Sequence, residues 1–299
     1  MPSIETLNNI MTNHVDLLNA NNVLEHDMNL VCPICLDKYD NNVHKESLEH
    51  VPQKSLGGKV IAITCNSCNN SCGVEIDRHL TNYIKRIENN EFVEGSDRFV
   101  VIDTPDGQLN AKLIVGNKDN LKLELNKTKN DPKTFEKRRE FISKDSLVEI
   151  QNKSPQIKKD GLNAALLKNA YMILFAKFGY TFLSSEYYNR IREQIKNPTA
   201  DIIPEGLWTL QKNIDIEDGV YLSNNNLHKG FFIVFTLKRI KEHRFMYYIP
   251  SPLIDVDIVA YYLRHIEKGD PLHLRKLGSI DYLLSVENIV WIKKWVEKW

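Results

Sequence analysis

Two Cys-x-x-Cys pairs constrain the fold of this chain more than any other feature of its sequence. The first pair is Cys32 and Cys35, and the second is Cys65 and Cys68. Two sulfurs three residues apart can bind one ion because a tight turn, or the first turn of a helix, brings them together, and two such pairs complete the tetrahedral shell of Zn²⁺. Four thiolates leave no coordination position for a substrate. We therefore expect a structural zinc that the surrounding small domain needs in order to fold.

The cysteine count agrees with a metal site rather than with disulfides. The chain has five cysteines in 299 residues, and paired spacing of this kind in a reducing compartment favours metal. Two unrelated pairs of reduced core cysteines are the alternative, and a redox dithiol is a further one. The fifth cysteine, Cys72, is interpreted as an ordinary helix residue, and a role as a substitute ligand stays open.

A second group of chemically active side chains lies between the two pairs and directly after them. Residues 48–58 read Leu-Glu-His-Val-Pro-Gln-Lys-Ser-Leu-Gly-Gly, and two asparagines, Asn69 and Asn70, follow the second pair. Taken together with the cysteines, these residues resemble the HNH, or ββα-metal, endonuclease family, in particular its zinc-stapled branch. The resemblance covers about residues 31–84, and it describes nothing in the rest of the chain.

The resemblance implies hydrolysis of phosphodiester bonds in DNA with one catalytic divalent cation. By position, His50 would be the general base that deprotonates the attacking water, and Glu49 and Asn69 would bind Mg²⁺ or Mn²⁺, which are hard ions that prefer oxygen ligands. Neighbouring side chains of a strand point to opposite sides, so Glu49 and His50 can serve different tasks. Asp77 is a further candidate metal ligand, and Lys54 is a candidate phosphate contact. A solvated surface position is the alternative for both.

Net charge gives no independent reason to expect a nucleic-acid partner. The chain carries 39 basic and 39 acidic side chains, and residues 1–80 carry five Lys or Arg against ten Asp or Glu. If the protein binds DNA, basic residues further along the chain should therefore supply much of the affinity, although a solvated surface is the alternative for such residues. The candidates are Lys133, Lys137, Arg138, Arg139, Lys153, Lys158, Lys159, Arg190, Arg192 and Lys196.

Length and apolar periodicity predict an α+β protein with two domains. Residues 1–30 are interpreted as a lead-in segment with a weak helical pattern. Residues 31–84 are expected to form the small ββα-metal zinc domain, and residues 85–299 a mixed domain of antiparallel strands and helices that positions DNA, senses a signal or binds a partner. The periodicity predicts strands at 98–103, 109–115, 121–125, 219–222, 230–237 and 244–249, and helices at 161–179, at 185–195 and at the C-terminus.

Location and assembly are predicted from simpler signals. No stretch is long and apolar enough for a membrane span, and the first residues lack the features of a secretory signal, so we expect a cytoplasmic protein without a membrane partner. Trp291, Trp295 and Trp299 recur at helical spacing. They predict a stripe that packs on the domain itself, on a second copy of the chain or on a partner protein.

The leading expectation for function is an HNH endonuclease that cleaves DNA. A place in antiviral defence or DNA processing is implied by family analogy alone. Two alternatives stay open. One is a noncatalytic zinc module that binds nucleic acid or protein, and the other is an HNH nuclease that cleaves RNA.

Overall fold

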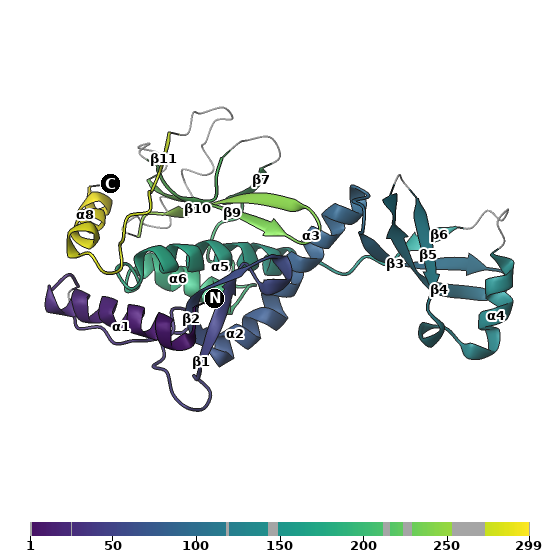
Figure 1. Ribbon diagram of the computed structural model, residues 1–299, viewed down its shortest axis with the longest axis horizontal. Coiled ribbons are helices and arrows are strands. Elements are labelled where there is room, and N and C mark those ends of the chain that lie inside the picture. Colours follow the sequence, from purple (N-terminus) through teal and green to yellow (C-terminus); the bar gives the residue numbers. More distant parts are fainter. Residues whose placement is uncertain are drawn as a thin grey trace. The chain divides into compact units, whose positions relative to one another are not determined.

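The computed structural model describes residues 2–24, 26–117, 120–142, 149–211, 216–223, 229–252 and 273–298. The chain folds into two compact units (Figure 1). The first unit comprises Met1–Leu80, Lys158–Lys238 and Glu242–Trp299, and the second comprises Thr81–Ile157 and Arg239–Lys241. The expected α+β class with antiparallel sheets is confirmed.

The first unit begins with helix α1 (Ile4–Ala20), within the segment that the sequence analysis interpreted as a lead-in. The Ser3 side chain caps this helix by accepting a hydrogen bond from the amide of Thr6. One face of α1 is buried, and its Leu7 packs against Val60 in a small apolar cluster. The segment is therefore part of the folded unit, because its weak apolar pattern is enough to cover a neighbouring hairpin.

A ββα element carries the cysteine pairs. Strand β1 (Glu46–Val51) pairs antiparallel with β2 (Lys59–Cys65). The chain then runs straight into helix α2 (Asn66–Cys72), a short π-helix η2 (Gly73–Asp77) and helix α3 (Arg78–Asn90). This order of two strands and a helical segment is the one that the sequence predicts for residues 31–84. Helix α3 leads the chain from the first unit into the second.

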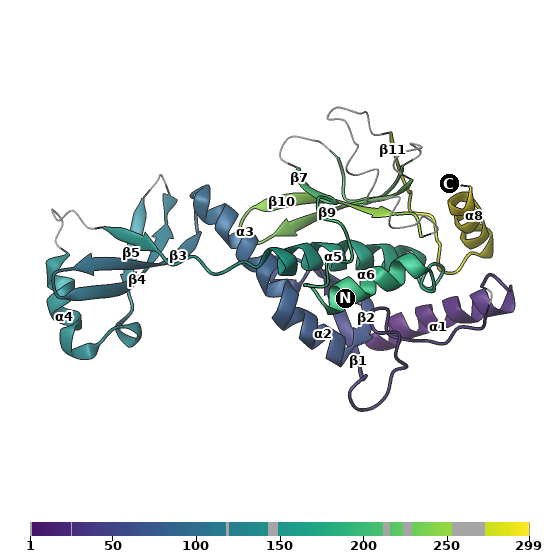
Figure 2. The ribbon, with the colours of Figure 1, turned by 180° about the vertical axis from the view of Figure 1, so that it is seen from behind.

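Helix α5 (Lys159–Phe178) forms the centre of the first unit and confirms the long buried helix expected at 161–179. Its residues are buried on nearly every side, because it contacts β1, β2 and η2 as well as helix α6 (Glu186–Lys196) and a sheet (Figure 2). Gly161 allows the close approach, since a Cβ atom there would lie 2.3 Å from a ring carbon of His79. Most of residues 85–299 thus belongs to the same unit as the cysteines.

The sheet of the first unit has five antiparallel strands in the order β11-β8-β9-β10-β7. Their bounds are β7 (Trp208–Gln211), β8 (Gly219–Ser223), β9 (Gly230–Lys238), β10 (Glu242–Pro250) and β11 (Leu274–Lys276). The strands expected at 219–222, 230–237 and 244–249 are confirmed as β8, β9 and β10, and β9 and β10 form a hairpin. The expected C-terminal helix is α8 (Val286–Glu297), on which Trp291 is 41% exposed. Trp299 lies outside the described residues.

The second unit contains a four-stranded antiparallel sheet in the order β5-β4-β3-β6. Its elements are β3 (Asp97–Thr104), β4 (Gly107–Val115), β5 (Leu121–Leu125), β6 (Ile150–Asn152), the 3-10 helix η4 (Lys127–Lys129) and helix α4 (Pro132–Phe141). Phe135 of α4 packs against apolar side chains of β3 and β4 and forms the core of this unit. The strands expected at 98–103, 109–115 and 121–125 are confirmed. Among the described residues, no helix is long and apolar enough to span a bilayer.

Candidate metal centre and neighbouring side chains

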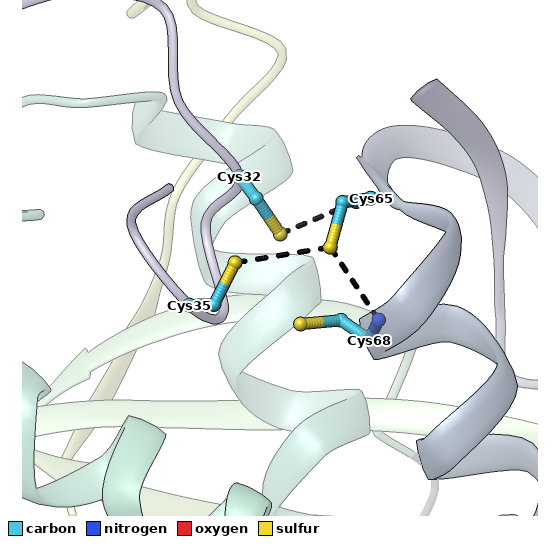
Figure 3. Close-up of side chains that lie close together, drawn as sticks. All are labelled: Cys32, Cys35, Cys65 and Cys68. Atoms are coloured by element: carbon cyan, nitrogen blue, oxygen red, sulfur yellow. Dashed lines mark hydrogen bonds between the residues drawn. The ribbon is translucent and has the colours of Figure 1, made fainter. Parts of the chain in front are cut away.

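The four paired cysteines of the first unit converge on one point (Figure 3). Their sulfurs all lie within 4.8 Å of one another, and the Sγ atoms of Cys35 and Cys65 are 3.7 Å apart. A zinc tetrahedron with Zn–S bonds of about 2.3 Å has edges of roughly 3.8 Å. A disulfide bond would be much shorter, at about 2.05 Å. The cluster therefore has the spacing of a tetrathiolate metal site.

The backbone holds these sulfurs in place with its own amides. Cys65 ends β2 and caps α2, and its Sγ accepts a hydrogen bond from the amide of Cys68 at 3.4 Å. The amide of Cys65 in turn donates to Cys32 Sγ at 3.3 Å. The first pair lies in a tight turn in which the amide of Leu36 donates to the Cys32 carbonyl at 2.9 Å. Both pairs thus use the local turns that the Cys-x-x-Cys spacing predicts.

The electrostatics of the cluster also fit a cation. Hydrogen bonds from Cys35 and Cys68 lower the pKa of the Cys32 thiol to about 4. The hydrogen bonds to Cys32 and Cys35, together with burial, raise the pKa of the Cys68 thiol. The first thiolate therefore forms easily, whereas further thiolates are opposed by its charge. A divalent ion such as Zn²⁺ removes this repulsion, so the four cysteines could bind one.

Residues from the C-terminal half of the chain support the first cysteine pair. The Tyr171 hydroxyl donates to the Pro33 carbonyl at 2.7 Å, and the Tyr180 hydroxyl donates to the Val31 carbonyl at 2.6 Å. Arg192 donates to the Tyr171 hydroxyl at 3.1 Å. Sequence reasoning missed these supporting residues, because an apolar helix pattern indicates burial but not the partner of each polar group.

A second possible ligand group borders the cysteine cluster. Cys35, Asp37 and His44 each offer one ligand atom, and these atoms lie within 4.8 Å of one another. The His44 ring nitrogen Nδ1 lies 4.0 Å from Cys35 Sγ and 3.7 Å from an Asp37 oxygen. His44, which had no role in the sequence analysis, thus lies next to the metal centre.

Glu49, expected to bind a catalytic ion, instead contacts a lysine of α5. Its Oε1 atom lies 2.8 Å from Lys168 Nζ, and its Oε2 atom accepts a hydrogen bond from the Thr64 hydroxyl at 3.1 Å. Asp77, the further candidate ligand, places Oδ2 at 2.8 Å from the same ammonium group. All three charged side chains are buried. The structure thus brings Glu49 and Asp77 together around Lys168.

The charges of this cluster keep the lysine protonated. Burial by itself lowers the pKa of Lys168, but the carboxylates of Glu49 and Asp77 more than reverse this effect, so that the pKa is raised. Burial also raises the pKa of Glu49, against the opposing effect of Lys168. In this arrangement the two carboxylates bind an ammonium group, which a divalent ion on Glu49 would have to displace.

His50 and Asn69 have different surroundings. His50 is half-buried near the end of β1, where the pairing register shifts between Glu49 and His50. Within the described part of the chain, no hydrogen bond holds its ring. The Asn69 amide group donates to the Ser47 hydroxyl at 2.8 Å and to the Leu48 carbonyl at 3.2 Å. Asn69 therefore ties α2 to β1.

The loop after His50 is shaped by its two glycines. Gly57 has a φ of +81°, which favours glycine, and a Cβ atom on Gly58 would lie 1.3 Å from the Pro52 carbonyl oxygen. The glycines are thus required by the tight backbone itself. Lys54, the candidate phosphate contact, is exposed in the 3-10 helix η1 (Lys54–Leu56) of this loop.

Several basic residues considered for DNA binding have internal partners instead. Arg192 is buried beneath the first cysteine pair. On α4, Lys137 pairs with Asp106 at 2.6 Å, and Arg138 donates to the Asp106 carbonyl at 2.9 Å. Arg139 pairs with a glutamate of its own helix. These contacts indicate structural roles for side chains that the sequence groups only by charge.

No known protein family, curated protein or solved structure matches this chain.

Proposed function

We propose that this chain is a zinc-stapled HNH-type endonuclease that hydrolyses phosphodiester bonds in DNA. The observation that carries the proposal is the ββα element, which joins the cysteine cluster, the strand with Glu49 and His50, and the helix with Asn69. These are the parts, in the order along the chain, that the resemblance of residues 31–84 implies. Their joint occurrence in one folded element supports a nuclease more strongly than any one of them does.

His50 is the proposed general base. Its half-buried position gives water access, and its ring can accept a proton because no hydrogen bond occupies it within the described residues. The water that loses its proton to His50 attacks the phosphorus, the bond from phosphorus to the 3′-oxygen breaks, and the departing 3′-oxygen takes a proton from solvent. The products are a 5′-phosphate and a 3′-hydroxyl. Asn69 is the proposed positioning residue, since it holds α2 against β1, the strand that carries His50.

The finer form of the proposal includes a catalytic Mg²⁺ or Mn²⁺ ion on Glu49 and Asn69. Such an ion would supply Lewis-acid stabilisation of the charge on the phosphate. Glu49 would first have to release Lys168, which now lies 2.8 Å from its carboxylate. Dependence of cleavage on divalent ions therefore has to be measured separately from cleavage itself.

One observation favours a second candidate function. Because Lys168 neutralises part of the charge of Glu49 and Asp77, the element would also serve as a noncatalytic zinc module that binds nucleic acid. In that case the buried ion cluster only stabilises the fold.

A nicking assay separates these functions. The full chain is incubated with supercoiled plasmid, and in parallel with single-stranded RNA, each with and without Mg²⁺ or Mn²⁺. The matched variants are His50→Ala and His26→Ala, since His26 is an exposed histidine outside the ββα element. Plasmid cleavage that is lost only in His50→Ala supports the proposal. Cleavage of RNA alone supports the RNA nuclease, and binding without cleavage supports the noncatalytic module.

A further inference from the structure

The second unit contains a cavity of about 710 Å³ with a strongly basic lining. Its walls come from α3, from strands β3, β4 and β5, from η4 and from the residues that follow β6. Glu124 is the one acidic residue in the lining within the described residues. The basic residues of the lining are Lys85, Arg98, Lys112, Lys127, Lys129 and Lys153.

An exposed aromatic ring lies among these cations. Phe99 of β3 is 43% exposed and lines the cavity. The Nζ atom of Lys129 lies 3.9 Å from the centre of its ring, and that of Lys85 lies 5.8 Å away. An apolar ring that is partly exposed and lies near two ammonium groups offers a stacking surface next to positive charge.

Among the described residues, three of the six cations in the lining have no acidic partner. Lys85 and Lys112 pair with Asp97, and Lys127 pairs with Glu136. By contrast, Lys129, Lys153 and Arg98 form no ion pair within the described residues. Lys153 donates to the Asn110 side chain at 3.0 Å. The Arg98 Nη2 atom is buried and has no hydrogen-bond partner among the described residues.

We propose that this cavity binds single-stranded nucleic acid. Lys129, Lys153 and Arg98 would bind phosphate groups, and Phe99 would stack on an unpaired base. Proteins that bind single strands combine a basic groove with exposed aromatic rings in this way. The volume suits one or a few nucleotides rather than a double helix, whose stacked bases could not reach the ring. This binding site adds a substrate class to the proposed function. It rests on that function only in the claim that the bound strand is a substrate.

The test is binding of fluorescent oligonucleotides to the full chain without Mg²⁺, so that cleavage plays no part. Fluorescence anisotropy is measured with a single strand of mixed DNA sequence and with the same sequence as a duplex. The single strand should bind more tightly. Phe99→Ala should weaken its binding about 5- to 140-fold, the loss of one stacked base. Phe99→Tyr keeps the ring and should bind like the wild type.

Salt dependence tests the phosphate contacts. Loss of one lysine that neutralises a phosphate lowers the slope of log K against log salt by about 0.7 for a single strand. Lys129→Gln should show this loss. Lys241→Gln is the matched control, because Lys241 belongs to the same unit, has a side chain that is 57% exposed and does not line the cavity. It should leave both the affinity and the slope unchanged.

Each arm of the experiment has an outcome that overturns the proposal. Equal affinity for duplex and single strand would do so, as would wild-type binding by Phe99→Ala or the same slope for Lys129→Gln and Lys241→Gln. If binding depends on Phe99 but the wild-type chain does not cleave in the nicking assay, the binding site stands and the nuclease proposal fails. If the chain cleaves without Phe99-dependent binding, the binding site fails alone.

Discussion

At the scale of single residues, Lys168 is the side chain on which the choice between a metal-dependent nuclease and a noncatalytic zinc module depends. It is buried, and both of the carboxylates that it contacts are also candidate metal ligands. A buried charge is costly unless it is paired, so the three side chains depend on one another. The same contacts that stabilise the first unit therefore compete with any divalent ion for Glu49.

Replacing Lys168 tests the stabilising role. Lys168→Met leaves the carboxylates of Glu49 and Asp77 buried without their cation, and should lower the free energy of unfolding by about 3–5 kcal/mol. Urea denaturation of the full chain measures this loss. Lys159→Met is the control, since Lys159 is 71% exposed and its pair with Glu205 should contribute about 0–1 kcal/mol. Similar losses in the two variants would contradict a buried ion cluster.

Variants of His50 and Glu49 should fail in different ways if the chain is a metal-dependent nuclease. His50→Ala should lose about 10²–10⁴-fold in cleavage rate at an unchanged metal requirement, since general-base catalysis typically contributes that much. Glu49→Ala should raise the Mg²⁺ concentration needed for half-maximal rate, and excess metal should partly restore cleavage. Metal titrations of the nicking rate distinguish the two. A wild-type rate in His50→Ala would exclude His50 as the base.

Sequence patterns predicted the residues whose partners are local. The cysteine cluster followed from the two Cys-x-x-Cys pairs. The contacts of Asn69 with β1 were not predicted, because the resemblance implied a metal ion as its partner. The partner of Glu49 was not predictable, because Lys168 lies far along the chain in a helix whose pattern indicates only burial. The sequence also contains no signal for the Tyr171 contact to the first pair.

At the scale of secondary-structure elements, the ββα element joins the metal centre to the proposed catalytic strand. It is small; Cys65 ends β2 and caps α2, and Cys68 lies in the first turn of α2. Metal binding and folding of such an element are coupled, since the thiolates would otherwise repel one another. Loss of the ion should therefore destabilise β1, β2 and α2 before the other elements of the unit.

Cysteine variants test this coupling. Cys68→Ser should lose the bound zinc and the hydrogen-exchange protection of residues 46–72, because three thiolates bind the ion less tightly. Cys72→Ser is the matched control, since Cys72 is buried in the same helix but does not belong to the cluster. It should keep one zinc ion per chain. Full zinc content in Cys68→Ser, measured by atomic absorption, would speak against the four-thiolate site.

The packing of helix α1 in the first unit can be tested through the pH dependence of stability that its residue His14 contributes. This histidine is buried, and its Nδ1 atom lies 2.6 Å from the Leu283 carbonyl oxygen. Burial lowers the pKa of His14, so the folded state resists protonation more than the unfolded state. His14 thus contributes stability above about pH 6.5, the ordinary value, and this contribution falls as the pH drops through the lower folded-state pKa.

Urea midpoints at pH 7.5 and pH 5.5 measure this dependence. The wild type should lose stability at the lower pH, and His14→Gln should lose less between the two pH values, although it is less stable at both. His26→Gln, at an exposed histidine, should follow the wild type. The same pH dependence in all three proteins would show that α1 does not carry the effect.

At the scale of the whole molecule, two separate segments of the chain form the second unit. Residues Thr81–Ile157 form most of it, and the turn Arg239–Lys241 between β9 and β10 completes it. Local periodicity predicted the longer strands and helices, such as β3, β9 and α5, but not the shorter elements β6, β7, β11 and α4. It also could not predict how the elements are grouped into two units. Grouping depends on contacts between distant segments, such as those of α5 with β1 and β2. The apolar pattern of α5, which predicts burial on nearly every side, was the one sequence feature that indicated this grouping.

Glu88 is the residue that holds the turn in the second unit. Its carboxylate is fully buried, pairs with the Arg239 guanidinium, and accepts hydrogen bonds from the amides of Ile240 and Lys241 at 2.8 Å and 3.1 Å. Removing its charge leaves Arg239 with only Asp97, at 3.1 Å, as an acidic partner among the described residues. The loss should be that of a buried ion pair, about 3–5 kcal/mol.

Glu88→Gln should therefore expose the second unit to proteolysis and lower its free energy of unfolding, while zinc content stays at one ion per chain because the cysteines belong to the first unit. Glu91→Gln is the matched control. Glu91 pairs with Lys241 at the surface, at 3.0 Å, and such a pair contributes only about 0–1 kcal/mol. Limited proteolysis followed by mass spectrometry locates the cleavage sites. Equal resistance of the two variants, or loss of zinc from Glu88→Gln, would contradict a second unit that is closed by this turn.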